Sequence, residues 1–130
     1  MAELKIGLKG EASVEVVFEN TAAAVGSGGL EVFGTPSMIA LMEKAALQSV
    51  QPYLDEGQGT VGLHLDVAHL AATPVGMTVR AESELEKVEG RMLFFQVRAY
   101  AGDELIGEGR HQRCIVYNDR FLAKAMAKLK

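Results

Sequence analysis

The spacing of hydrophobic and polar residues changes twice along the chain, and these changes divide it into elements. Residues 12–18, ASVEVVF, predict a strand that is followed by a glycine-rich connection. From Pro36 to Val50 the apolar residues recur with the period of a helix, which ends at QPYLDEGQG. From Val61 to Val67 apolar residues alternate with others, which is typical of a half-buried strand.

The second half of the chain predicts a sheet. Between the breakers TPVG, EG and GDE, strands are expected at 77–87, 91–101 and 104–117. These strands would form an antiparallel meander, and a closing helix would span 119–128. One long helix against four or five antiparallel strands is an α+β architecture, here expected as a single domain over residues 1–130. Gly107 and Gly109 in the last strand predict a bulge or a close backbone approach.

Glu43 stands out because its place on the helix does not match its polarity. At 100° per residue the polar residues form one stripe, made of Ser37, Lys44, Gln48 and Gln51. Glu43 falls about a third of a turn away from it, among apolar residues. A carboxylate there is costly unless it is paired or hydrogen-bonded. Two interpretations stay open: a base or nucleophile, or a structural glutamate paired with a strand arginine.

Thr35 and His69 each have two interpretations as well. Thr35 followed by Pro36 predicts an N-cap with proline at the first helical position. The same place would set the hydroxyl beside free N–H groups, where an oxyanion is stabilised. His69 continues the apolar face of its strand and is either a satisfied core residue or a catalyst. His64 lies on the opposite face, which argues against a shared metal site.

Composition and charge exclude several function classes. The 130 residues carry a net charge of -4, which argues against a nucleic-acid partner. The single cysteine, Cys114, excludes an internal disulfide framework and fits a reducing cytoplasm. No apolar run reaches transmembrane length and no signal-peptide core is seen, so neither a membrane partner nor secretion is expected. GQGTVG precedes a strand instead of opening a helix, so a dinucleotide site is not predicted.

Four segments together resemble a known family. TPSMIALME, LDEGQGTVG, HLAATPVG and EGRHQR are similar to the fluoroacetyl-coenzyme A thioesterase branch of the hotdog thioesterases, and the resemblance runs from about Val32 to the C-terminus. Carried over by position, it implies a catalytic triad of Thr35, Glu43 and His69. It also implies substrate-binding roles for Gly62, which would contact the thioester region, and Arg113, which would support the site.

The resemblance implies a hotdog fold and hydrolysis of a small or medium acyl-coenzyme A to the free acid and coenzyme A. No metal or organic cofactor is implied, and Glu43 would be either nucleophile or general base. A homodimer is implied, with Glu43 and His69 reaching one cleft from different chains. One departure is that the phenylalanine lid of the F-P-E motif is replaced by Gly29-Leu30-Glu31. The alternatives are a hotdog dehydratase or hydratase and a non-catalytic acyl-coenzyme A-binding module.

Overall fold

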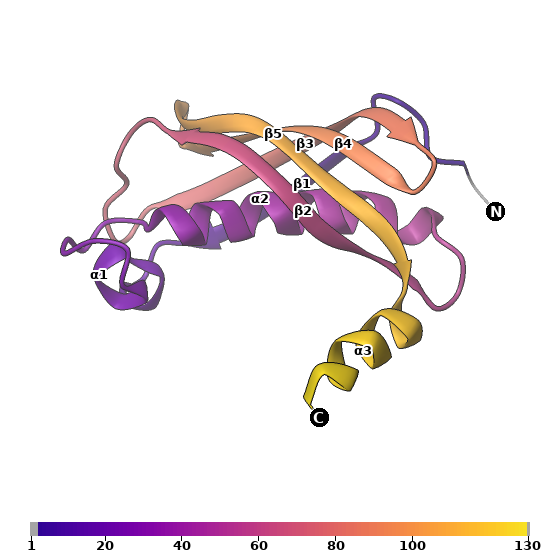
Figure 1. The fold of residues 1–130 in the computed structure, drawn as a ribbon. Coiled ribbons are helices and arrows are strands. Elements are labelled where there is room, and N and C mark those ends of the chain that lie inside the picture. Colours follow the sequence, from indigo (N-terminus) through magenta and orange to yellow (C-terminus); the bar gives the residue numbers. More distant parts are fainter. Residues whose placement is uncertain (1–2, 130) are drawn as a thin grey trace.

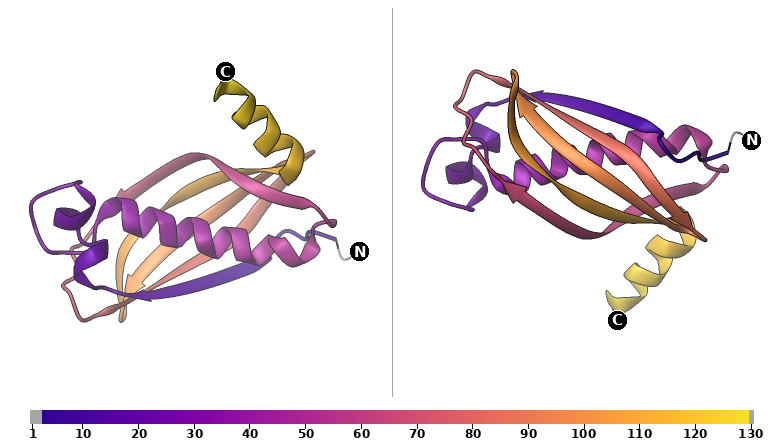
Figure 2. Two further views of the ribbon diagram at one scale, coloured as in Figure 1. Left: turned by 90° about the horizontal axis from the view of Figure 1, so that it is seen from below. Right: turned by 90° about the horizontal axis from the view of Figure 1, so that it is seen from above.

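Five antiparallel strands form one sheet in the order β1-β3-β4-β5-β2, and one long helix lies across a face of it (Figures 1 and 2). A computed structural model describes residues 3–129. Its strands are β1 (Lys9–Glu15), β2 (Gln58–His69), β3 (Thr78–Glu89), β4 (Met92–Ala101) and β5 (Glu104–Tyr117). The predicted α+β class and the meander of the second half are confirmed.

The first strand differs from its predicted bounds. It begins at Lys9 and ends at Glu15, whereas 12–18 was expected. Val16 is fully buried, but it already belongs to the connection, and Phe18 opens a short 3-10 helix, η1 (Phe18–Asn20). Hydrophobicity alone therefore extended the strand prediction past the turn.

The long helix is α2 (Thr35–Val50), and four further short elements complete the described chain. They are α1 (Ala22–Val25), η2 (Gln51–Tyr53), α3 (Asn118–Met126) and η3 (Ala127–Leu129). Figure 1 shows α3 projecting from the end of β5, away from the sheet. Within residues 3–129, no helix is long and apolar enough to cross a membrane.

The core lies between α2 and the sheet. The buried residues of the helix are Met38, Leu41, Met42, Ala45, Ala46 and Val50, which confirms the predicted apolar face. They meet alternate residues of β3 and β4, such as Leu85 and Phe95, which are fully buried. Each such large apolar side chain contributes about 1.5–3 kcal/mol by leaving water. Gly10 lets β1 pass close under the helix, because a side chain there would collide with the carbonyl oxygen of Ala45.

A bulge in β2 decides which residues face the helix. Gly62 pairs with Arg113 of β5, but the next pair joins His64 to Gln112, so Leu63 is an extra residue. Gly62 before the bulge and His69 beyond it consequently face α2 together. The predicted uninterrupted alternation from Val61 to Val67 is wrong at this point.

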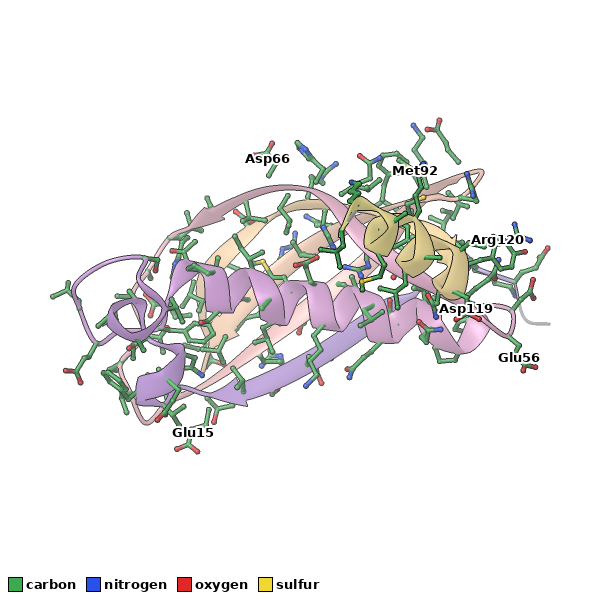
Figure 3. All side chains as sticks on the ribbon, turned by 60° about the horizontal axis from the view of Figure 1, so that its bottom comes forward. Glu15, Glu56, Asp66, Met92, Asp119 and Arg120 are labelled. Carbon is green, nitrogen blue, oxygen red and sulfur yellow. The ribbon has the colours of Figure 1, made fainter. Side chains whose placement is uncertain are left out.

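Residues on the other side of β2 point away from the helix, as Asp66 does in Figure 3. The glycines predicted to allow a close approach do so. A side chain at Gly107 would meet the sulfur of Met38, and one at Gly109 would meet the backbone of Asp66 and Val67. Strand β5 can therefore lie close to both α2 and β2.

Candidate functional site

Thr35 and His69 are joined at the beginning of α2. The Oγ1 atom of Thr35 lies 2.7 Å from Nδ1 of His69, which is the last residue of β2. The N-cap of the helix is Gly34, whose carbonyl accepts from the Met38 N–H at 2.9 Å. The prediction that Thr35 is the N-cap is therefore wrong. Thr35 lies one residue inside the helix, and its hydroxyl binds the histidine.

The other ring nitrogen of His69 is the more informative one. Nε2 is buried, and within residues 3–129 it has no hydrogen-bond partner. Burial lowers the pKa of His69 from its ordinary value, and the nearby backbone of Ala71 opposes this shift. His69 is thus a neutral imidazole at pH 7 with one ring nitrogen not committed to the fold.

Thr35 and His69 border a hollow of about 310 Å³. Its remaining walls are Ala22, Ser27, Val32, Phe33, Leu70, Ala71 and Ala72. This volume lies at the lower end of the range found for small-molecule sites, and the walls combine apolar side chains with the polar Ser27, Thr35 and His69. The hollow can accept a short aliphatic or small aromatic group beside the threonine and histidine.

Glu43 lies further along α2 and is paired with Arg113. Its Oε2 atom accepts from Nη1 of Arg113 at 3.1 Å, so the strand arginine of the structural interpretation is present. The Glu43 side chain is nevertheless 35% exposed to solvent. No hydrogen bond engages Oε1 within the described part of the chain. The pairing therefore orients one oxygen and leaves the other accessible, so a chemical role remains open.

The backbone of β2 passes directly beneath this carboxylate at Gly62. A methyl group there would overlap Oε2 of Glu43 and would lie 3.4 Å from Nη1 of Arg113. The absence of a side chain at Gly62 thus leaves the space that the Glu43 carboxylate occupies. The structure brings together Glu43, Gly62 and Arg113 as a second group.

Arg113 is held by Thr60 as well as by Glu43. Its Nε donates to the Thr60 hydroxyl at 2.8 Å and its Nη2 donates to the Thr60 carbonyl at 2.9 Å. Burial lowers the pKa of Arg113 from its ordinary value, and the negative charge of Glu43 opposes that shift. The guanidinium stays charged and its plane is fixed, which suits an arginine that must aim a carboxylate.

Sequence reasoning missed His111, which completes this group. Its Nε2 lies 3.2 Å from Nη1 of Arg113 and 3.8 Å from Oε2 of Glu43. The motif EGRHQR contained the signal, because residues two apart on a strand share a face and His111 stands two before Arg113. The sequence did not show that the face of β5 that carries His111 and Arg113 is turned toward Glu43.

The two groups are separate within one chain. Thr35 and Glu43 are eight residues apart, which is about 12 Å along a helix axis. A single chain therefore brings together Thr35 with His69, and Glu43 with Gly62 and Arg113, but not the three members of the predicted triad.

A larger hollow of about 420 Å³ lies elsewhere, over β1, β3 and β4. Its walls include three carboxylates, those of Glu11, Glu82 and Glu84. Lys9 and Arg98 also line it, so its charge is mixed, and no histidine lines the hollow. We assign no substrate site there.

Comparison with known proteins decides the family. The profile described as FlK, fluoroacetyl-CoA-specific thioesterase, matches residues 16–119. The chain belongs to the FlK family. The fluoroacetyl-CoA thioesterase of Streptantibioticus cattleyicolor is 44% identical over 98 residues, which are 75% of this chain and 70% of that protein. The predicted branch and the predicted thioester hydrolase are confirmed.

Solved structures agree with the FlK assignment. A crystal structure of the fluoroacetyl-CoA thioesterase FlK is 34% identical, with a TM-score of 0.92 and coverage of 98% of each chain. A hot-dog-like protein from Thermanaerovibrio acidaminovorans has a TM-score of 0.86 at 21% identity, over 96% of this chain and 93% of that one. The hotdog fold is therefore confirmed, while the roles of the individual site residues stay predictions.

Proposed function

We propose that this protein hydrolyses small or medium acyl-coenzyme A thioesters with Thr35, Glu43 and His69 at the reaction centre. The observation that carries the proposal is the hydrogen bond between Thr35 and His69 at the border of a hollow. By strict geometry Nε2 of His69 forms no hydrogen bond within the described chain, although the backbone of Ala71 lies near enough to the ring to affect its pKa.

The start of α2 suits the charge that develops during hydrolysis. Attack on a thioester carbonyl creates an oxyanion, and the first N–H groups of a helix stabilise negative charge. The Thr35 hydroxyl is at that end of the helix and can orient the carbonyl. Neutral His69 can donate or accept at Nε2, depending on its tautomer, and so can position water or stabilise the departing thiolate.

Glu43 supplies the reacting carboxylate in this proposal. As nucleophile it would attack the thioester carbonyl, expel the coenzyme A thiolate and leave an acyl-enzyme anhydride that water cleaves. As general base it would take a proton from the water that attacks the carbonyl. A single turnover in ¹⁸O-labelled water can demonstrate the nucleophilic route. Label enters the Glu43 carboxylate when water attacks the glutamyl carbonyl of the anhydride, and it cannot enter on the general-base route. Both routes need only side chains and water.

A homodimer brings the two groups of residues together. Strand β2 is an edge of the sheet, twelve residues long, and Leu63 on it is 53% exposed. An uncovered strand edge of this length favours pairing with a second copy. If two β2 strands pair antiparallel about a twofold axis at Asp66, with Leu63 as the extra residue of the bulge, Gly62 of one chain lies opposite His69 of the other. Glu43 of one chain would then approach the Thr35–His69 pair of its partner.

The substrate indicates where the protein works. Acyl-coenzyme A esters are intracellular metabolites, and a lone cysteine such as Cys114 suits a reducing compartment. We therefore propose a cytoplasmic enzyme that acts as a single domain on each chain.

A thiol-release assay over acyl-coenzyme A esters of graded chain length tests the function. Free coenzyme A should appear together with the carboxylic acid. Formation of an alkene or a hydroxyacyl thioester without thiol release would favour the hotdog hydratase alternative. Tight binding without any turnover would favour the non-catalytic module.

A further inference from the structure

His111 is the most deeply buried ionisable residue near Glu43. It is 2% exposed, and its ring stacks on Phe95 of β4 with the two centroids 6.1 Å apart. A histidine in such a place must find partners for both ring nitrogens, or the fold loses stability. Its partners reveal the protonation state of the ring.

One nitrogen fixes the tautomer. Nδ1 of His111 lies 2.9 Å from the backbone carbonyl of His64. A carbonyl oxygen can only accept, so Nδ1 carries the hydrogen and donates it. In the neutral ring Nε2 is then a bare acceptor. This carbonyl lies immediately after the bulge at Leu63, where β2 changes register.

The bare nitrogen meets a donor that is also bound to Glu43. Nη1 of Arg113 carries two hydrogens, and it lies 3.2 Å from Nε2 of His111 and 3.1 Å from Oε2 of Glu43. One hydrogen can go to each partner. Since Thr60 engages Nε and Nη2, the guanidinium has little freedom to rotate.

We propose that neutral His111 is a positioning residue for Glu43: by accepting one Nη1 hydrogen of Arg113, it directs the other onto the Glu43 carboxylate. The proposal rests on the proposed role of Glu43 in hydrolysis. His111 itself touches no reacting atom. It acts through Arg113, and it keeps Oε2 engaged so that Oε1 is the oxygen that faces the substrate.

The surroundings of His111 keep it neutral. Burial is the largest cause that lowers its pKa, and the positive charge of Arg113 from β5 adds to it. The side chain of His64 on β2 also lowers it, while the His64 carbonyl and Glu43 from α2 oppose the shift. The remaining ring neighbour, Phe95 of β4, is uncharged. A proton on Nε2 would face the N–H of Arg113 and would push the guanidinium away from Glu43.

The first test uses the wild-type protein and needs no substitution. Nitrogen-15 NMR of the histidine rings distinguishes a protonated from a bare ring nitrogen. We expect His111 at pH 7 to show a protonated Nδ1 and a bare Nε2. An imidazolium, or the opposite tautomer, would overturn the proposal whatever the enzyme's activity.

The second test measures thiol release by three variants. His111→Leu removes the acceptor at similar bulk, His111→Gln restores an acceptor oxygen, and Gln112→Leu controls for a change in the same strand on its other face. We expect His111→Leu to lower kcat at least about tenfold, as expected when a buried donor loses its partner, with KM changed less than about twofold. The kcat of His111→Gln should recover to within about threefold of the wild-type value. The kcat of Gln112→Leu should equal that of wild type.

The outcomes separate the two proposals. If wild type releases thiol and His111→Leu keeps its kcat, positioning by His111 is refuted and the hydrolase stands. If His111→Leu and His111→Gln lose kcat equally, the residue is needed only for packing and the inference is wrong. If wild type releases no thiol from any ester, the proposed function fails, and the role of His111 fails with it.

Discussion

The carboxylate of Glu43 rests directly above the α-carbon of Gly62, in a place that a single methyl group would fill. We therefore expect Gly62→Ala to displace Glu43 without unfolding the protein, because only a partly exposed side chain must move. A displacement of about 1 Å at a reacting group can cost up to a hundredfold, so kcat should fall about ten- to a hundredfold.

Steady-state thiol release checks this expectation, with circular dichroism to confirm the fold. Gly28→Ala is a matched control, because a methyl group there makes only an ordinary contact of 3.4 Å with Ala22. Full activity of Gly62→Ala would mean that the resting position of Glu43 has no bearing on turnover.

Removal of the carboxylate itself should be more severe. Glu43→Ala deletes the proposed nucleophile or base, and kcat should drop at least about a hundredfold. Lys44→Ala is the control, since Lys44 is exposed on the same turn of α2 and should leave kcat unchanged. Near-normal turnover by Glu43→Ala would mean that the ion pair between Glu43 and Arg113 has only a structural role.

Much of this arrangement could be predicted from the sequence. The helical period identified the buried face of α2 and showed that Glu43 lies away from the polar stripe. It could not choose the partner of Glu43, because Arg113 is seventy residues away and only the sheet register brings it near. Resemblance to the family supplied Arg113, and the ion pair now gives that residue a physical role.

Other features depend on backbone details that a periodic pattern does not contain. The bulge at Leu63 places Gly62 and His69 on one side of β2, whereas simple alternation put them on opposite faces. The same alternation did not indicate the partner of His111, the His64 carbonyl, which lies immediately after the bulge. Thr35 was predicted as an N-cap because the start of a helix is uncertain by a residue, and here one residue decides whether the hydroxyl caps the helix or binds His69.

The buried His111 and the half-buried His69 should make the fold sensitive to mild acid. The pKa values of His69 and His111 are both lowered in the folded chain, so between pH 7 and pH 5 the unfolded chain binds more protons. The free energy of unfolding must then fall as the pH falls, by at most about 1.4 kcal/mol per pH unit for each histidine.

Urea denaturation at several pH values between 5 and 7 measures this slope. His111→Gln should flatten it, because one of the two contributing groups is gone. An unfolding free energy that stays constant in wild type over this range would show that neither histidine resists protonation in the folded protein.

A site shared between two chains predicts complementation. Glu43→Ala and His69→Ala proteins should each be inactive alone. When they are mixed under conditions of chain exchange, about half of the dimers are mixed, and each mixed dimer regains one of its two sites. Thiol release should therefore rise to about a quarter of the wild-type rate.

Two other results would contradict the shared site. Continued inactivity of the mixture, with exchange verified by differently tagged chains, would place the complete site within one chain. Sedimentation of the wild-type protein as a monomer at micromolar concentration would remove the dimer on which the shared site depends.

The range of substrates should depend on residue 29. Resemblance to the FlK family puts Gly29 where fluoroacetyl-specific members carry the lid phenylalanine, and nothing lies within 4 Å of a side chain added there. Without an aromatic lid the hollow beside Thr35 and His69 stays open. Apolar pockets discriminate by only about 1–3 kcal/mol per methylene-sized difference, so we expect little preference for fluoroacetyl over acetyl. Butyryl- and phenylacetyl-coenzyme A should be accepted as well.

Gly29→Phe should reverse this behaviour. The backbone of Gly29 is not in the left-handed region and the space around it is free, so the fold should tolerate the larger residue. The new ring should narrow the opening and lower kcat/KM for phenylacetyl- and butyryl-coenzyme A by about tenfold or more, while the acetyl ester loses little. Leu30→Phe is the control, because Leu30 is 71% exposed and already carries a large apolar side chain. A wild-type enzyme with a large fluoroacetyl preference would show that a residue other than the lid phenylalanine creates that selectivity.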